Sequence, residues 1–256
     1  MDTKGKALRL KELHEASGIL RMVNVWDAIT TRVIASLPET KAIATAGHSI
    51  AASHGYADGT IPADLALSAL KPIVEATDLP VTADLDAGFD DPGETTRRAI
   101  DMGIVGANVE DRMKPLAESV KAVEAVVKAA EQSGIAFQLN ARTDALIKGG
   151  DRPLEEGVKD AIERGRAYLD AGAALVFVPA VLDRETTMAL VDGLGRGKLS
   201  VIGLQGAMRA AEYESLGVAR ITYGPWTQRH ALTALKQLAG SLYADGVIPE
   251  EAEALN

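Results

Sequence analysis

The stretch Val81–Phe89, VTADLDAGF, decides how the rest of the sequence is interpreted. It begins as an apolar run of the kind that forms a buried strand, and it continues into two acids, Asp84 and Asp86. Alternate residues of a strand share one face, so both carboxylates should point the same way. An apolar strand that ends in paired carboxylates indicates a functional edge of a sheet.

Seven more apolar or β-branched segments flank this stretch and alternate with helical patterns. The eight expected strands cover residues 19–27, 41–49, 79–88, 105–111, 136–144, 174–181, 199–205 and 219–224. Near-continuous apolar strands indicate a parallel sheet that is covered on both faces. Eight such units in 256 residues favour an α/β fold of the (β/α)8 TIM-barrel type over a doubly wound sheet. We expect one barrel domain over 1–256, with 225–256 as a C-terminal helical segment, and a helix that ends at Gly134.

Composition excludes several classes of function. The net charge is −9 with scattered basic residues, which argues against a nucleic-acid partner. No apolar run is long enough to span a membrane, and the polar N-terminus lacks the apolar region of a secretory signal. There is no cysteine, which fits a reducing compartment and excludes thiolate metal sites and thiol nucleophiles. We therefore expect a cytoplasmic protein.

Acidic residues also follow the neighbouring strands. Glu110 ends the fourth expected strand, and Asp58 lies shortly beyond the second. In a barrel of this type the active site lies at the C-terminal strand ends, where Asp84, Asp86 and Glu110 would meet. Carboxylate oxygens without cysteine favour a hard cation, so we expect Mg²⁺, with Mn²⁺ as its substitute. A single acid at such a position is often a helix cap or an ion-pair partner, and this is the interpretation that we prefer for Asp111.

The fifth expected strand ends in a cation. Asn140 and Arg142 share a face by the same alternation, and an arginine that points into a barrel mouth needs an anion. Arg142 could bind a substrate carboxylate or phosphonate as a fork. The alternative is an ion pair with Asp86 or Glu110.

The second expected strand ends in Gly47 and His48. A glycine lets backbone N–H groups approach an oxyanion, and a histidine can donate a hydrogen bond or a proton. Trp26 closes the first strand, where it could line the pocket floor or belong to the core. His14 and His230 lie in helical context and are interpreted as structural.

Four motifs together resemble the isocitrate lyase and phosphoenolpyruvate mutase superfamily over nearly the whole chain. They are TADLDAGF (82–89), GANVED (106–111), NARTD (140–144) and the loop SIAASHGYAD (49–58). The resemblance implies a (β/α)8 barrel whose last helix is exchanged between subunits of a homodimer or homotetramer. It implies Mg²⁺ at Asp84, Asp86 and Glu110, with Asp58 nearby, and a small anionic 2-oxo acid as substrate. The expected catalytic residues are Arg142, His48 and Asp58, and the expected substrate-binding residues are Ala46, Gly47, His48, Trp26, Asn140 and Arg142.

The chain also departs from the superfamily pattern. The cysteine loop of isocitrate and methylisocitrate lyases is absent, and the long gating loop of the mutase is reduced to Arg112–Pro115. We therefore expect a Mg²⁺-dependent lyase that cleaves a C–C bond of a 2-oxo or 2-hydroxy dicarboxylic acid through a pyruvate-type enolate. The alternatives are a phosphoenolpyruvate phosphonomutase or phosphonopyruvate hydrolase, and a non-catalytic 2-oxo acid binding protein.

Overall fold

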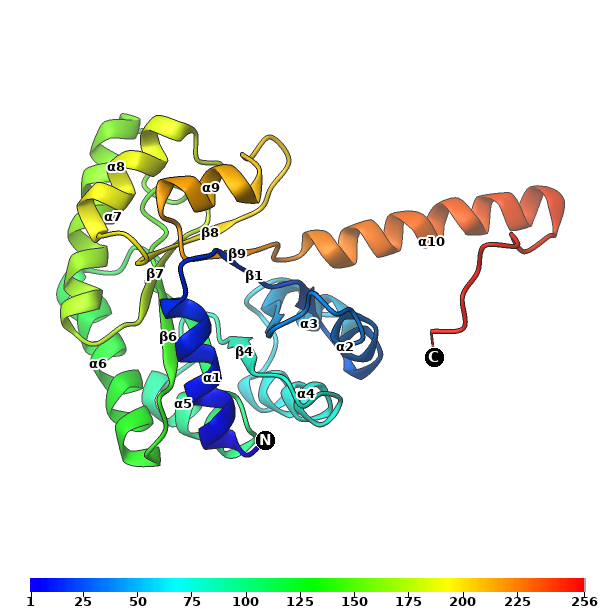
Figure 1. The fold of residues 1–256 in the computed structure, drawn as a ribbon, viewed down its shortest axis with the longest axis horizontal. Coiled ribbons are helices and arrows are strands. Elements are labelled where there is room, and N and C mark those ends of the chain that lie inside the picture. The colour runs from blue at the N-terminus through cyan, green and yellow to red at the C-terminus, as the bar shows by residue number, and fades with distance from the viewer. Residues whose placement is uncertain (256) are drawn as a thin grey trace.

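The computed structural model describes residues 1–255 and contains one sheet of parallel strands surrounded by helices (Figure 1). The strands are β1 (Leu20–Arg21), β2 (Asn24–Val25), β3 (Ile43–Thr45), β4 (Val81–Asp84), β5 (Gly106–Glu110), β6 (Gln138–Arg142), β7 (Leu175–Val178), β8 (Leu199–Ile202) and β9 (Arg220–Thr222). Their spatial order is β1-β9-β8-β7-β6-β5-β4-β3-β2. The segment 20–25 pairs with β9 through β1 and with β3 through β2, so it closes the sheet on itself. The predicted TIM-barrel fold is confirmed, with the first expected strand divided into two short stretches.

Helices follow the strands around the outside of the barrel. They are α1 (Thr3–Glu15), α2 (Ala28–Ala35), α3 (Gly47–Ser53), α4 (Ala63–Glu75), α5 (Pro92–Asp101), α6 (Leu116–Ser133), α7 (Leu154–Asp170), α8 (Arg184–Leu194), α9 (Ala210–Leu216) and α10 (Trp226–Asp245). The expected end of α6 is confirmed, because Gly134 adopts a left-handed φ of 65° that caps the helix.

Helix α1 was not predicted from the charged N-terminal sequence. It begins at the N-cap Asp2, whose side chain accepts a hydrogen bond from the Gly5 N–H. Ala7 and Leu10 are completely buried on its inner face. They pack in a small core with Met22 and close the N-terminal end of the barrel, opposite the strand ends of interest.

Helix α3 corrects the predicted strand over 41–49. The strand ends at Thr45, and Gly47 already begins a helix whose Ile50 and Ala51 are buried against the sheet. A short apolar run fits a strand and a buried helix equally well, so periodicity could not separate them. As a result, Gly47 and His48 lie on the first turn of a helix.

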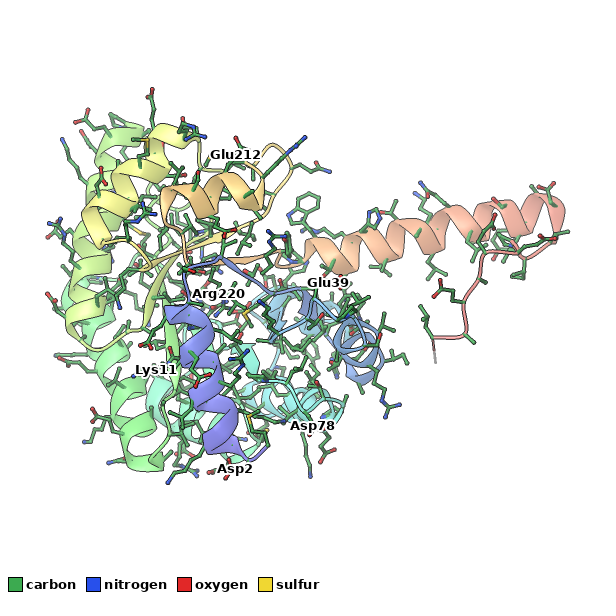
Figure 2. All side chains as sticks on the ribbon, viewed as in Figure 1. Asp2, Lys11, Glu39, Asp78, Glu212 and Arg220 are labelled. Atoms are coloured by element: carbon green, nitrogen blue, oxygen red, sulfur yellow. The ribbon has the colours of Figure 1, made fainter. Side chains whose placement is uncertain are left out.

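The interior of the barrel is polar at mid-height, whereas the apolar core lies between the sheet and the helices. Arg220 is completely buried in the middle of the molecule (Figure 2), and its Nη2 donates to Thr82 Oγ1 at 3.2 Å. Asn140 donates to Asn108 Oδ1 at 2.8 Å and to Ser200 Oγ at 3.2 Å. Burial lowers the pKa of Arg220 to about 10, and the charge of the nearby Asp84 opposes this shift. A polar layer therefore supports the floor of the barrel mouth.

Helix α10 points away from the barrel and has no other element beside most of its length (Figure 1). Leu232 and Leu235 are 55% and 60% exposed on it. The predicted C-terminal helix is thus present, but a single chain does not show an exchange between subunits. Across residues 1–255, none of the helices combines the length and the apolar character that membrane crossing requires.

Candidate active site

A cavity of about 570 Å³ opens at the C-terminal ends of the strands. It brings together most of the residues singled out in the sequence, which line its walls: Ala46, His48, Asp58, Asp84, Asp86, Glu110 and Arg142. The functional edge expected from VTADLDAGF is therefore the mouth of the barrel. Gly47, Trp26 and Asn140 are not among the lining residues, and their positions are described below.

Asp84 is the last residue of β4 and faces the first turn of α3. The Gly47 N–H donates to Asp84 Oδ2 at 3.1 Å, and the Asp84 N–H donates to Thr45 Oγ1 at 3.0 Å. Burial is the main cause that raises the pKa of the Asp84 carboxyl, with a further contribution from Glu110, whereas Arg142 opposes it. The carboxylate is thus fixed in a position where its charge is poorly compensated.

Asp86 lies beyond the end of β4, so the strand alternation that was expected to align it with Asp84 does not apply. Its φ of 51° is left-handed, and this turn brings its carboxylate back toward Asp84. A Cβ placed on Gly47 would lie 3.2 Å from Asp84 Oδ2 and 3.4 Å from Asp86 Oδ1. Both carboxylates therefore approach the same point above the glycine backbone. Burial, and then the charges of Asp84 and Glu110, raise the pKa of Asp86 to about 7.

Glu110 ends β5 and is surrounded by cations. Its side chain is only 8% exposed, and its Oε2 lies 2.9 Å from Arg142 Nη1. Its Oε1 accepts from Arg112 Nε at 2.8 Å and lies 3.8 Å from Lys148 Nζ. The ion pair that was the alternative role of Arg142 is present, and Arg142 also donates from Nε to Asp144 Oδ1 at 2.8 Å.

The sequence suggests that these acids bind a hard cation. Among residues 1–255, no three acidic or histidine side chains converge closely enough to form a ready-made metal site. Asp84 and Asp86 nevertheless offer oxygens on one side of the cavity, where burial and then the neighbouring acids raise the pKa of both carboxyl groups. Mg²⁺ keeps several waters and needs few direct protein ligands. These two carboxylates fit a hydrated Mg²⁺, whereas Glu110 is engaged by cations.

His48 and Asp58 lie next to one another at the rim. His48 Nδ1 is 3.5 Å from Asp58 Oδ2, and the Asp58 side chain is 62% exposed. His48 belongs to the first turn of α3, whereas Asp58 comes from the loop that precedes α4. This pair can present a proton donor or acceptor to the cavity.

Of the three predicted residues that do not line the cavity, Gly47 donates its N–H to Asp84, whereas Asn140 and Trp26 lie outside the cavity for different reasons. Asn140 shares the inner face of β6 with Arg142, but it lies two residues earlier on the strand and therefore belongs to the polar layer below the floor. Trp26 lines a second, apolar hollow of about 530 Å³ together with Ile29 and Trp226. Trp26 therefore lies beside α10 and packs partly against the main core.

Three cations of the cavity were missed in the sequence: Arg112, Lys148 and Arg229. Arg112 and Lys148 follow the ends of the fourth and fifth expected strands, so a search for cations after strand ends would have found them. Arg229 belongs to the first turns of α10, where its guanidinium lies 4.9 Å from the centre of the Trp226 ring. Its approach to the cavity depends on how α10 leaves the barrel, which no local pattern indicates.

Asp111 is an ion-pair partner, as predicted. Its Oδ2 accepts from Tyr168 Oη at 2.8 Å and lies 3.3 Å from Arg164 Nη1. Its Oδ1 accepts from the N–H groups of Met113 and Asp144, each at 3.0 Å. One buried carboxylate thus fixes the turn after β5 to the turn after β6.

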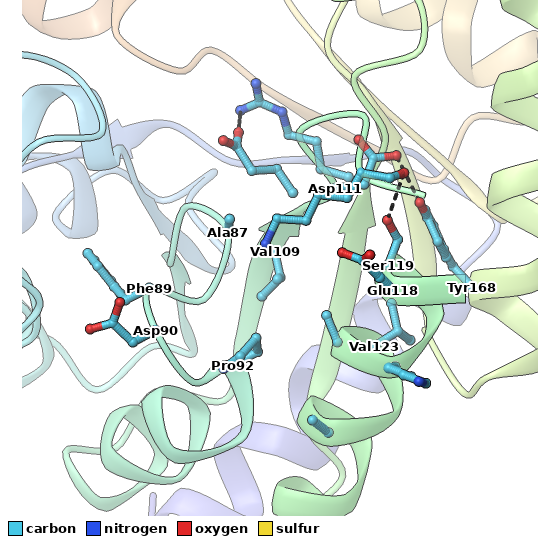
Figure 3. Close-up of a pocket in the computed structure, with 16 residues that line it drawn as sticks. Ala87, Phe89, Asp90, Pro92, Val109, Asp111, Glu118, Ser119, Val123 and Tyr168 are labelled. Carbon is cyan, nitrogen blue, oxygen red and sulfur yellow. Dashed lines mark hydrogen bonds and ion pairs between the residues drawn. The ribbon is translucent and has the colours of Figure 1, made fainter. Parts of the chain in front are cut away.

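A side cavity of about 330 Å³ lies behind the mouth of the barrel (Figure 3). Phe89 and Pro92 lie on one side of it, and Tyr168 lies on the other. Glu110 and Arg142 line both this cavity and the main one. Their ion pair therefore forms part of the wall between the two.

A comparison with protein families matches residues 10–243 to the family described as phosphoenolpyruvate phosphomutase. The matched range includes every strand of the barrel and all of the site residues described above.

Individual relatives carry lyase and mutase names. The chain is 25% identical to 2-methylisocitrate lyase of Bacillus subtilis (strain 168), over 93% of this chain and 82% of that protein. It is 29% identical to 2,3-dimethylmalate lyase of Eubacterium barkeri, over 82% of this chain and 77% of that protein. A crystal structure from Burkholderia cenocepacia J2315, named as a candidate phosphonomutase, is 32% identical with a TM-score of 0.87, covering 93% of this chain and 99% of that one.

Proposed function

The chain belongs to the phosphoenolpyruvate phosphomutase family, and we propose that it is a Mg²⁺-dependent lyase that cleaves a C–C bond of a small 2-oxo or 2-hydroxy dicarboxylic acid through a pyruvate-type enolate. One observation carries this proposal. The cavity is divided into an acidic side, with Asp84 and Asp86, and a basic side, where Arg142, Arg112 and Lys148 surround a single glutamate. Such a division suits a cation on one side and a multiply charged organic anion on the other.

Each residue of the site has a role in this reaction. Arg142 is held by Glu110 and Asp144, so its remaining N–H groups can orient a substrate carboxylate as a fork. His48, beside Asp58, moves a proton to or from the substrate at one of its ring nitrogens. Asp84 and Asp86 would hold the divalent cation, which would supply positive charge to stabilise the enolate oxygen. The electrons of the breaking C–C bond enter the enolate, while the other fragment leaves as a carbonyl compound after its hydroxyl group has given up a proton, or as CO2 when a carboxylate is lost. The enolate then takes up a proton.

The similarity to a candidate phosphonomutase, at 32% identity, favours P–C chemistry as a second function. Against it, only residues 111–115 connect β5 to α6. A phosphoryl group in transit must be shielded from water, and so short a connection offers little cover. The relatives named 2-methylisocitrate lyase and 2,3-dimethylmalate lyase support the C–C lyase as the first choice.

The test is a turnover screen by ¹H and ³¹P NMR, with Mg²⁺ and with EDTA. The panel contains oxaloacetate, substituted malates, phosphoenolpyruvate and phosphonopyruvate. We expect metal-dependent loss of one dicarboxylic acid, abolished in Asp84→Ala with the fold retained by circular dichroism. Consumption of a phosphonate would establish the second function instead. Binding of oxalate with Mg²⁺ but no turnover of any panel member would favour a non-catalytic binding protein.

We further propose that α10 packs against another copy of this chain in a homodimer or homotetramer. Leu232 and Leu235 lie three residues apart on one face of α10, and an apolar hollow lies around Trp26 beside the same helix. Apolar residues that gather on an exposed helix suit an interface. Light scattering after gel filtration tests it. We expect Leu235→Glu to shift the mass toward the monomer, and a monomeric parent protein would contradict the proposal.

A further inference from the structure

Arg112 lies in the short connection between β5 and α6. Its φ is 48° and that of the next residue, Met113, is 58°, so two consecutive side-chain-bearing residues are left-handed. Such a conformation is strained for a residue with a side chain and persists only where the surroundings hold it. Here Asp111 holds it, because its Oδ1 accepts from the Met113 N–H at 3.0 Å. The backbone therefore fixes the direction in which the Arg112 side chain leaves.

That direction carries the guanidinium over the cavity. Arg112 Nε donates to Glu110 Oε1 at 2.8 Å, and Arg112 Nη2 lies 3.5 Å from where a Cβ of Gly59 would stand. Gly59 belongs to the loop before α4, so the side chain reaches from the end of β5 along the rim of the cavity, past β4, to the loop that follows α3. Arg112 is 43% exposed, whereas Glu110 is 8% exposed. The guanidinium is thus the outer and more movable partner of the pair.

Glu110 has more cationic partners than its two oxygens need. Arg142 occupies Oε2 and is held in place by Asp144, whereas Arg112 and Lys148 share Oε1. Glu110 interacts electrostatically with Asp84 and Asp86, so positive charge added at these two acids also compensates the charge of Glu110 and weakens its attraction for Arg112. Arg112 can leave Glu110 without leaving a buried carboxylate unpaired, because Arg142 remains.

From this geometry we propose that Arg112 recognises the distal carboxylate of a dicarboxylic substrate, and that it must leave Glu110 to do so. The inference rests on the proposed function and adds a named residue for the second carboxylate. Arg112 sets specificity, and the pairing with Glu110 couples binding of the cation to binding of the organic anion. By linkage, each ligand should then strengthen the affinity for the other.

The test uses Arg112→Met, with Arg112→Lys as the conservative variant. The control is Arg97→Met, because Arg97 is exposed on α5 and, among residues 1–255, its ion pairs are with Glu94 and Asp101 of the same helix. Mn²⁺ binding is measured by electron paramagnetic resonance without any organic ligand. Binding of oxalate, lactate and malate to the Mn²⁺-loaded protein is measured by calorimetry. Lactate and malate differ in the distal carboxylate that Arg112 is proposed to bind.

We expect the parent protein to prefer malate over lactate, and Arg112→Met to reduce that preference about 10- to 100-fold, which is the effect of losing one charge-assisted hydrogen-bonded partner. Arg112→Met should bind Mn²⁺ several-fold more tightly and oxalate as before. Arg112→Lys should keep part of the preference, and Arg97→Met should change nothing.

Two results would overturn the inference. The inference would fail if the parent protein bound malate and lactate with equal affinity, because there would then be no distal subsite. It would also fail if Arg112→Met kept both the preference for malate and the parental Mn²⁺ affinity. Failure of the parent protein to bind Mn²⁺ and oxalate at all would defeat the proposed function as well, so the two failures are distinguishable.

Discussion

Gly47→Ala should separate the function of the site from the stability of the fold. Gly47 begins α3 with an ordinary helical φ, so alanine fits the backbone and its helix propensity adds up to about 1 kcal/mol of stability. The new methyl group would lie 3.2 Å from Asp84 Oδ2 and 3.4 Å from Asp86 Oδ1. The Asp84 carboxylate must then move by a few tenths of an ångström, whereas the contact with Asp86 is an ordinary van der Waals contact. Metal–ligand distances tolerate only about 0.2 Å.

We therefore expect Mn²⁺ affinity and turnover to fall about 10- to 100-fold, while the free energy of unfolding stays within about 1 kcal/mol of the parent value. Mn²⁺ binding by electron paramagnetic resonance, the NMR turnover assay and urea unfolding measure the three quantities. Gly240→Ala is the matched control, because Gly240 lies in α10 and its Cβ would meet no atom within 4 Å. If Gly47→Ala binds Mn²⁺ as tightly as the parent, the cation is not held by these two carboxylates and the reasoning fails.

Two further predictions concern buried residues outside the main cavity, His14 and Tyr168. Burial, with the charge of Arg220, lowers the pKa of His14 to about 3. At this site the unfolded chain binds more protons than the folded one below pH 6.5, so on acidification from pH 6.5 to 4.5 the contribution of His14 to the free energy of unfolding should fall by up to about 1.4 kcal/mol per pH unit. The raised pKa of Asp86 contributes with the opposite sign over the same range, so the His14 effect is the difference in pH slope between the parent and His14→Gln in urea unfolding. Equal slopes of the two proteins would contradict the burial of a neutral ring. Tyr168→Phe removes the 2.8 Å hydrogen bond to Asp111 and should cost about 1.5–3 kcal/mol in the same assay, whereas a neutral result would mean that Arg164 alone satisfies the carboxylate.

Much of the fold follows from local chemistry that the sequence displays. Strands such as β7 are apolar runs, and the left-handed cap at Gly134 follows from its missing side chain. The positions of Asp84 and Glu110 at the mouth follow from the rule that places strand ends at one edge. Asp111 was correctly interpreted as an ion-pair partner.

The parts that could not be predicted depend on tertiary contacts. The left-handed turn at Asp86 is imposed by the chain that follows the strand, not by its residue type. Helix α3 and the preceding strand share one apolar run, so their boundary depends on how Ile50 is buried. The cations around Glu110 come from separate loops, and only the closed barrel brings Arg112 and Lys148 to the same oxygen.

The way in which residues 20–25 complete the ring has a consequence for synthesis of the chain. Leu20 is paired with Arg220, and Asn24 Oδ1 accepts from the Gly224 N–H across a separation of 200 residues. During translation, residues 20–25 therefore keep one edge unpaired until almost the whole chain has left the ribosome. An unpaired edge can pair with the wrong strand, and contacts over such a separation form slowly. Recovery after dilution from urea should therefore depend on protein concentration and on chaperones more than the stability of the finished barrel suggests.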